Sequence, residues 1–168
     1  MPVGDVDSNE KGSAARYNDG KPELAQIPMV KWMRRAQCRD SLDTGWVVEV
    51  LNHWHCYQCT GNHRHLMEAF EAVPVSRLRL AADVLTYGAD KYAQWNWTKG
   101  QSWSVPFNSG LRHLAAWLDH EDFDPESGLS HLGHFICNVL FLSQYSLAYQ
   151  EGEDWVVYKA LENIECAS

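Results

Sequence analysis

The residues best suited to chemistry lie in one short segment between Arg112 and Asn138. Histidines, carboxylates and an amide follow one another there more densely than in an ordinary surface turn. Imidazole nitrogen and carboxylate oxygen are donors that bind divalent metal ions in proteins. We therefore expect a metal-centred active site in this segment. The candidate metal ligands are Glu121, Asp124, Glu126, His131, His134 and Asn138.

Spacing is the reason to treat several of these residues as one group. His131, His134 and Asn138 stand at i, i+3 and i+7, so a helix would project all three from one side. His113 belongs to the preceding apolar pattern and can face that helix. A single histidine of this kind is more often a hydrogen-bonded core residue, so the prediction depends on the whole group.

The acidic turn between the two apolar patterns supplies hard oxygen ligands. These suit Mg²⁺ or Mn²⁺, and added imidazole shifts the preference somewhat toward Mn²⁺. Two or more such ions can neutralise a triphosphate and lower the pKa of a bound water, whose hydroxide then attacks phosphorus in line. An acidic turn can also be only a solvated surface. The candidate catalytic residues are His113, Glu121 and Asp124.

Two further groups of residues suit a nucleotide. Indole can stack on a purine, an amide can read the edge of a base, and cationic side chains can meet phosphate. The same tryptophans also suit a hydrophobic core, and polar residues on an arm often have no role. The predicted substrate-binding residues are Arg16, Asn18, Lys21, Lys91, Trp95, Asn96, Trp97 and Arg112.

Helical patterns must position these side chains. Apolar residues recur with helical spacing in several stretches, and valine and isoleucine runs bounded by turns are scarce, so we predict an all-α fold. Expected helices cover about 29–39, 45–55, 65–72, 75–88, 107–119 and 130–149, with a shorter one after Asp154. We expect one domain over 1–168, with an N-terminal arm (1–28) and a Cys/His-containing insert (about 38–65).

Composition narrows the function class. The chain has 168 residues, 45% of them hydrophobic, and a formal net charge of −8. Such a negative charge argues against binding to a nucleic-acid backbone, because phosphate attracts an excess of lysine and arginine. No apolar run approaches the roughly 20 residues needed to span a bilayer, and the polar N-terminus carries no signal-peptide core. We therefore expect a cytoplasmic protein with no membrane partner and, with five cysteines, no structural disulfide.

The insert has the C-x-x-C spacing of half a zinc site, with imidazoles nearby. A second well-spaced pair is missing, because the two histidines stand closer together than in the usual H-x₃₋₅-H. A helical hairpin with incidental thiols is the competing interpretation. If zinc binds, we expect it to be structural and held by Cys56, Cys59, His63 and His65.

Several of these segments together make the chain resemble the phage dATP/dGTP diphosphohydrolase family, which is MazG-like. The resemblance covers residues 14–22 and 75 to about 146. It rests on Ala15-Arg-Tyr-Asn-Asp-Gly-Lys-Pro22, Leu85-Thr-Tyr-Gly-Ala-Asp-Lys-Tyr92 with Asn96-Trp97, Arg112-His113-Leu114, and Asp124-Pro-Glu-Ser-Gly-Leu129 through His131, His134 and Asn138.

The resemblance implies a MazG-like helical bundle that forms a homo-oligomer, a dimer or a tetramer. It also implies a nucleoside triphosphate pyrophosphohydrolase that cleaves between the α and β phosphates with Mg²⁺ or Mn²⁺. The expected substrate is a purine deoxynucleoside triphosphate, foremost dGTP, which would give dGMP for phage 2-aminoadenine nucleotide synthesis. MazG relatives carry EExxE and ExxD motifs, whereas the corresponding helices here carry Arg112-His113 and His131-x-x-His134.

Two alternatives remain open from the sequence. The first is an HD-type triphosphohydrolase that releases intact triphosphate, but His120 is followed by Glu121 and not by the aspartate of an His-Asp pair. The second is a zinc-containing interaction module without catalysis, in which the insert binds a partner and the acidic turn is solvated. The products formed from nucleoside triphosphates distinguish the three hypotheses: monophosphate and pyrophosphate, intact triphosphate, or no product.

Overall fold

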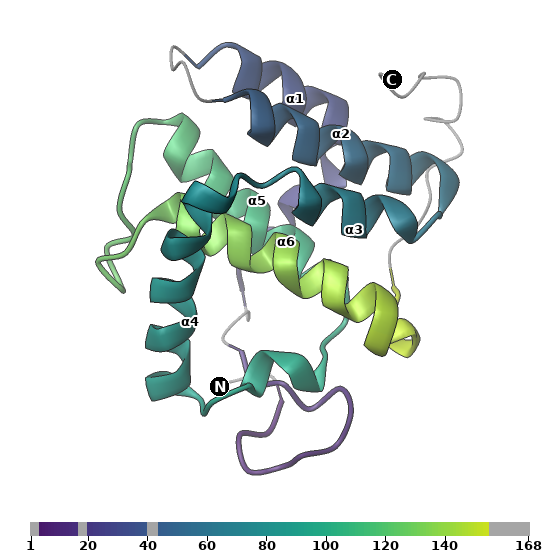
Figure 1. The fold of residues 1–168 in the computed structure, drawn as a ribbon, viewed down its shortest axis with the longest axis vertical. Coiled ribbons are helices and arrows are strands. Elements are labelled where there is room, and N and C mark those ends of the chain that lie inside the picture. The colour runs from purple at the N-terminus through teal and green to yellow at the C-terminus, as the bar shows by residue number, and fades with distance from the viewer. Residues whose placement is uncertain (1–3, 17–19, 40–43, 155–168) are drawn as a thin grey trace.

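Helices make up the regular structure of the chain (Figure 1). The computed structural model describes residues 4–16, 20–39 and 44–154. The α-helices in these ranges are α1 (Met29–Gln37), α2 (Gly45–Thr60), α3 (Arg64–Glu71), α4 (Leu78–Lys91), α5 (Ser104–Leu118) and α6 (His131–Ala148). Short 3-10 helices are η1 (Leu24–Gln26), η2 (Val75–Arg77), η3 (Asn96–Lys99) and η4 (Gln150–Gly152).

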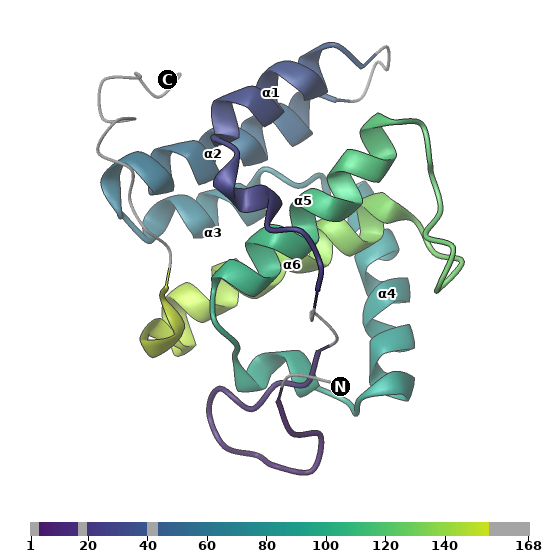
Figure 2. The same ribbon diagram turned by 180° about the vertical axis from the view of Figure 1, so that it is seen from behind.

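The predicted all-α fold is confirmed. Within the described ranges, β-type pairing is limited to one isolated antiparallel bridge between Phe123 and Ser130. Helices α5 and α6 pack side by side through the middle, α4 stands against α6, and α1–α3 form a layer at one end (Figures 1 and 2). None of the described helices is both long enough and apolar enough to cross a membrane.

The largest departure from the predicted elements is in α2, which continues past the expected end at residue 55. Cys56 and Cys59 therefore lie on a helix, and the expected helix end at residue 55 is wrong. The helix stops only at Gly61, whose φ of 68° is the left-handed C-terminal conformation that glycine adopts without strain. Buried Trp54 and Tyr57 keep the helix packed on the core up to that point.

Helix α5 begins three residues before the expected start, at Ser104, and includes Pro106. Proline is tolerated there because the first-turn N–H groups have no partner inside a helix. The Asp154 carboxylate caps this helix end, accepting hydrogen bonds from the Ser104 N–H at 2.7 Å and from the Ser104 hydroxyl at 2.6 Å. The short helix expected after Asp154 falls outside the described residues.

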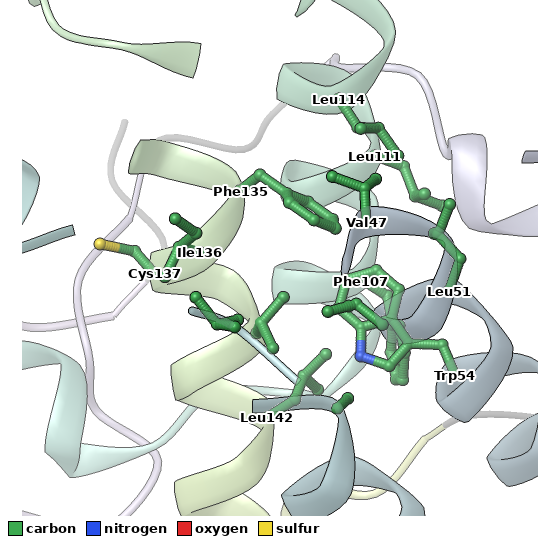
Figure 3. Packing of buried hydrophobic residues seen from close by; sticks show 14 of the residues in the cluster. Val47, Leu51, Trp54, Phe107, Leu111, Leu114, Phe135, Ile136, Cys137 and Leu142 are labelled. Atoms are coloured by element: carbon green, nitrogen blue, oxygen red, sulfur yellow. The ribbon is translucent and has the colours of Figure 1, made fainter. Parts of the chain in front are cut away.

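The core lies where α2 meets α5 and α6 (Figure 3). Trp54 of α2 packs edge-on against Phe107 of α5, with ring centroids 5.0 Å apart, and against Phe135 of α6 at 5.6 Å. All three side chains are fully buried. Large aromatic side chains contribute strongly to core stability, so α2, which lies within the predicted insert (about 38–65), is part of the central packing.

Two glycines allow the helices that carry the ligand-type residues to approach closely. A Cβ added at Gly110 of α5 would lie 3.2 Å from the Cβ of Asn138 on α6. A Cβ added at Gly133 of α6 would lie only 2.6 Å from the carbonyl oxygen of Leu80 on α4. The second contact is with backbone, which cannot rotate away, so α4 and α6 can keep their spacing only with glycine at this position.

Residues 4–16 of the N-terminal arm lie at the end of the molecule opposite α1–α3 (Figures 1 and 2). Their backbone pairs with the end of η3 and the residue after it, through Gly12 N–H to the Lys99 carbonyl at 2.7 Å and Ala14 N–H to the Gly100 carbonyl at 3.2 Å. The Asn96 side chain donates to the Ala15 carbonyl and accepts from the Ala15 N–H, both at 3.2 Å. These bonds hold the chain just before Arg16.

Replacing Gly133 by alanine should lower the free energy of unfolding by about 1–3 kcal/mol, because the added methyl overlaps the Leu80 backbone. Gly88 is a matched control, since it is also helical and a Cβ there meets nothing within 4 Å. Gly88→Ala should be neutral or stabilise by about 0.5–1 kcal/mol. Urea unfolding followed by circular dichroism measures both, and equal effects would contradict the close approach of α4 and α6.

Candidate active site

A pocket of about 710 Å³ opens between α4, the 92–97 segment, and the facing sides of α5 and α6. The N-terminal arm contributes Arg16 and Lys21 to its lining. The volume is within the range of pockets that bind small molecules, roughly 300–1,000 Å³. From the predicted ligand group, the pocket is lined by His113, Asp124, Glu126, His131 and His134.

Three histidines from two helices meet beside this pocket. Nδ1 of His113 on α5 lies 2.9 Å from Nδ1 of His131 on α6. The His113 ring also stacks on that of His134, with centroids 4.3 Å apart and an angle of 9° between planes. The helical spacing of the sequence predicts this arrangement, with His131 and His134 on one side of α6 and His113 opposite them.

A tight turn before α6 brings Asp124 to the histidines. The Asp124 carboxylate accepts hydrogen bonds from the Ser127 N–H at 3.0 Å and the Ser127 hydroxyl at 2.7 Å. The same hydroxyl lies 2.9 Å from Nε2 of His134, and Oδ2 of Asp124 is 3.7 Å from that nitrogen. Ser127 therefore connects the carboxylate to the histidine group.

Burial controls the protonation of these side chains. It lowers the pKa of His113 to about 2, helped by the neighbouring His134 and His131. It lowers the pKa of His134 to about 4, although Asp124 acts in the opposite direction. Burial alone would raise the pKa of Asp124, but hydrogen bonds from Ser127 and the nearby His134 outweigh it, so the net shift is downward. At neutral pH both imidazoles are uncharged and the carboxylate is ionised.

This donor set fits a divalent metal ion. His113, Asp124 and His131 each offer a ligand atom, and the three atoms lie within 4.8 Å of one another. Nε2 of His131 is buried and makes no hydrogen bond, although it is 3.5 Å from Oε1 of Glu121. An unsatisfied buried nitrogen is rare and calls for a missing partner. Two imidazoles with one carboxylate suit Mn²⁺ or another transition ion better than Mg²⁺.

Cationic side chains gather on the arm side of the pocket. The Arg16 guanidinium donates to the Ser109 hydroxyl at 3.1 Å, and its NH1 group is buried without a hydrogen-bond partner. Arg112 donates to the Pro22 carbonyl at 3.2 Å, and burial, followed by the charge of Arg16, lowers the Arg112 pKa to about 10. Burial and Arg112 also lower the pKa of Lys21. This region would be stabilised by an anion.

The aromatic part of the pocket lies beyond α4. Trp95 is 70% exposed and has a φ of 61°, an uncommon backbone conformation for a bulky residue. Trp97 stacks on Phe141 of α6, with centroids 5.2 Å apart. Asn96 is buried, and its amide group is occupied by the Ala15 backbone. Trp95 is therefore the indole that a ligand can reach most easily.

The structure places the remaining predicted residues around this site, apart from Asn18. Glu126 pairs with Lys91, Oε1 to Nζ at 2.6 Å, and both side chains line the pocket. Glu121 is half exposed and outside the lining, although its carboxylate approaches His131. Asn138 is buried below the site and donates to the His134 carbonyl at 2.8 Å, while its Oδ1 has no hydrogen-bond partner. Asn18 lies outside the described residues.

The four predicted zinc ligands are not brought together. His63 binds the Glu153 carboxylate at 2.9 Å, whereas His65 is grouped with His53 and Glu68. Contrary to expectation, Cys56 is disulfide-bonded. Among the described residues, no metal-type group includes a cysteine.

The sequence interpretation missed two serines of the site. Ser109 receives hydrogen bonds from Arg16 at 3.1 Å and from Asn138 at 3.5 Å. It stands four residues before His113, so helical spacing places both on the same face of α5 and could have identified it. Ser127 follows Asp124 by three residues, a spacing at which aspartate commonly bonds the backbone of a turn.

Low pH should destabilise the metal-free protein through the buried histidines. The pKa of His134 in the folded protein, about 4, is below its ordinary value of 6.5. The unfolded chain therefore binds protons first, so this contribution to stability is complete above about pH 6.5 and is lost as the pH falls toward 4.

His134→Gln should weaken the pH dependence of the free energy of unfolding, measured by urea unfolding in EDTA between pH 7 and pH 5. His120→Gln is the control, because His120 is an exposed turn residue. An unchanged pH dependence in His134→Gln would contradict the buried neutral imidazole.

Comparison with known proteins gives one match. The family model for dATP/dGTP diphosphohydrolase, N-terminal, matches residues 60–155, which include α3–α6 and most of the pocket. No curated protein and no solved structure matches significantly. The match includes the resemblance at residues 75–146, whereas residues 14–22 lie outside it. More than half of the chain fits the model, so the protein belongs to the dATP/dGTP diphosphohydrolase family and is a nucleoside triphosphate diphosphohydrolase.

Proposed function

We propose that the pocket hydrolyses purine deoxynucleoside triphosphates, preferably dGTP, between the α and β phosphates with the help of Mg²⁺ or Mn²⁺. The products are the monophosphate and pyrophosphate. One observation carries this proposal: a single pocket joins the His113–Asp124–His131 donor group to the Arg16 guanidinium, whose NH1 group is buried without a hydrogen-bond partner. Metal ligands and positive charge together are what a triphosphate requires.

The arginines hold the phosphates in this proposal. Arg16 and Arg112 are partly desolvated, and their mutual repulsion and burial lower the pKa of Arg112. A phosphate oxygen accepts strong charge-assisted hydrogen bonds from guanidinium, and Arg16 NH1 has a donor available for one. Lys21 adds charge from the arm. Lys91 is already paired with Glu126, so it contributes least to net positive charge.

The donor group positions the reacting phosphate and the attacking water. A bound divalent ion would neutralise phosphate charge and make a water more acidic. We propose His113 as a catalytic residue that acts as a ligand to the ion, because its ligand atom lies within 4.8 Å of those of Asp124 and His131 and burial keeps its imidazole neutral by lowering its pKa. The ionised Asp124 can bind the ion and orient water, and Ser127 holds the carboxylate in place. Glu126, Glu121, His134 and Asn138 complete the proposed surroundings.

The base end of the substrate would meet the tryptophans. A purine can stack on the exposed face of Trp95, an interaction worth about 1–3 kcal/mol per base. Asn96 supports this pocket by holding Ala15, and Trp97 is fixed by Phe141. Asn18 is proposed as a further substrate contact from the sequence pattern alone.

Several finer proposals rest on the resemblance of the sequence motifs. We propose one domain over 1–168 that acts as a homo-oligomer, a dimer or a tetramer, in the cytoplasm. We also propose that the dGMP product feeds the synthesis of 2-aminoadenine nucleotides in a phage-infected host. Light scattering after size-exclusion chromatography measures the oligomeric state directly. A monomer at the protein concentration used in the activity assay would contradict the proposed homo-oligomer.

Product analysis tests the activity itself. The protein is incubated with a mixed pool of nucleoside and deoxynucleoside triphosphates and with Mg²⁺ or Mn²⁺, and the products are separated by ion-exchange chromatography. We expect dGMP and pyrophosphate. Intact triphosphate as product would indicate the HD-type reaction instead, and no consumption with either ion would overturn the proposal.

Asp124→Asn should reduce the rate of hydrolysis by at least about 10- to 100-fold, because the amide is a weaker metal ligand and no longer carries charge. Asp119→Asn is a matched control: Asp119 is an exposed residue outside the pocket, so its rate should equal that of the unchanged protein. Steady-state kinetics at several Mn²⁺ concentrations measures both. Equal rates of hydrolysis for the two variants would show that Asp124 does not act in the proposed site.

A further inference from the structure

A second group of metal-type side chains lies between α2 and α3, outside the pocket. It consists of His53 on α2 and of His65 and Glu68 on α3, and none of them lines the pocket. His65 and Glu68 are three residues apart, so α3 projects both from one face. The helices α2 and α3 pack against each other, which brings His53 to the same place.

The distances within this group match those of a metal site. Oε2 of Glu68 lies 3.4 Å from Nδ1 of His53 and 3.2 Å from Nδ1 of His65. The two imidazole rings are nearly parallel, with an angle of 29° and centroids 6.1 Å apart. In a tetrahedral zinc site with bonds of about 2.0–2.1 Å, neighbouring donor atoms are roughly 3.3 Å apart. A zinc ion therefore requires little movement of the carboxylate oxygen relative to either imidazole nitrogen, and the three ligand atoms lie within 4.8 Å of one another.

The carboxylate is held in the orientation that such a site requires. Nε of Arg64 lies 2.9 Å from Oε1 of Glu68, the oxygen that faces away from the imidazoles. This ion pair leaves Oε2 for the two histidines, as an outer partner does for a metal-bound carboxylate. The side chains of His53, His65 and Glu68 are between 21% and 27% exposed, so an ion from solvent can reach them.

We propose that His53, His65 and Glu68 form a binding site for Zn²⁺ or a similar transition ion that links α2 to α3. Two imidazole nitrogens and one carboxylate oxygen favour such ions over Mg²⁺ or Ca²⁺. Three protein ligands leave the fourth tetrahedral position to water. Because the ion would be bound only when α2 and α3 are packed together, it stabilises the folded state.

This site differs from the zinc site that the sequence suggested. It keeps His65 but replaces both cysteines and His63 by His53 and Glu68, which α2 and α3 bring together. The site is independent of the proposed hydrolysis, because its residues do not line the active-site pocket. Loss of this site should leave Mg²⁺-dependent hydrolysis unchanged.

Zinc binding tests the proposal. The full chain is dialysed against Zn²⁺ in the presence of excess Mg²⁺, and the bound zinc per chain is measured by atomic absorption. His53→Gln, His65→Gln and Glu68→Gln should each bind one zinc fewer than the unchanged protein at micromolar free Zn²⁺. His63→Gln is the matched control, since it removes a nearby, comparably exposed histidine that binds Glu153 and not this group. The His63→Gln variant should bind as much zinc per chain as the unchanged protein.

Thermal unfolding provides a second readout. Zinc at 100 times its dissociation constant should raise the melting temperature of the unchanged protein and of His63→Gln by about 5–10 °C. The three ligand variants should lose most of that rise, while circular dichroism verifies that they fold. If the ligand variants bind as much zinc as His63→Gln and gain the same stability, the group is a hydrogen-bonded cluster and the proposal is overturned.

Discussion

The close approach of α6 to its neighbours is the constraint on which the remaining structure depends. At Gly133 the α6 backbone is so near the Leu80 carbonyl that a methyl group does not fit, and at Gly110 α5 comes close to α6, though less tightly. These contacts set the spacing of three helices at once. His131 and His134 flank Gly133 in the sequence, so the contact that fixes α4 against α6 also fixes where both imidazoles stand. Trp54 packs against Phe107 of α5 and Phe135 of α6, and its ring lies next to Gly110, so it supports the contact between these two helices.

The pocket combines two kinds of side chain that differ in their response to burial. Imidazoles respond by losing the proton, so His113 and His134 become neutral donors. Guanidinium keeps its charge even when desolvated, so Arg16 and Arg112 remain cations. The pocket is therefore positive on the arm side and neutral at the histidines, with Asp124 as its ionised acid. A metal ion bound to an anionic phosphate chain satisfies both parts.

Much of the fold could be predicted from the sequence, because it depends on local patterns. Helical periodicity predicts α6 over nearly its full length, and the i, i+3, i+7 spacing of His131, His134 and Asn138 puts them on one side of it. The helix expected over 75–88 is shifted, because residues 75–77 form a 3-10 turn and α4 continues past Gly88 to Lys91. The predicted end of α2 at residue 55 is wrong, because the helix stops only at Gly61. The predicted start of α5 at residue 107 is late, because the first turn of a helix accepts Pro106.

The site was less predictable, because it depends on contacts between distant segments. Sequence spacing cannot show that Glu121 stays outside the pocket lining, that Lys91 pairs with Glu126, or that Asn96 binds Ala15. Nor can it bring His53 to His65 and Glu68, which requires the packing of α2 on α3. These contacts follow from tertiary geometry. In each case the sequence shows the residue type but not the residue that it contacts.

The docking of the arm has a thermodynamic consequence. Arg16 reaches the pocket because the arm pairs with Lys99 and Gly100 and because Asn96 holds Ala15. An anion that binds Arg16 therefore binds the docked arm more tightly than an undocked one, and the two equilibria are linked. Linkage is reciprocal. If a bound phosphate favours the docked arm by some factor, then phosphate binds more weakly to the undocked arm by the same factor. Susceptibility of the arm to proteases is thus linked to the occupancy of the pocket by an anion.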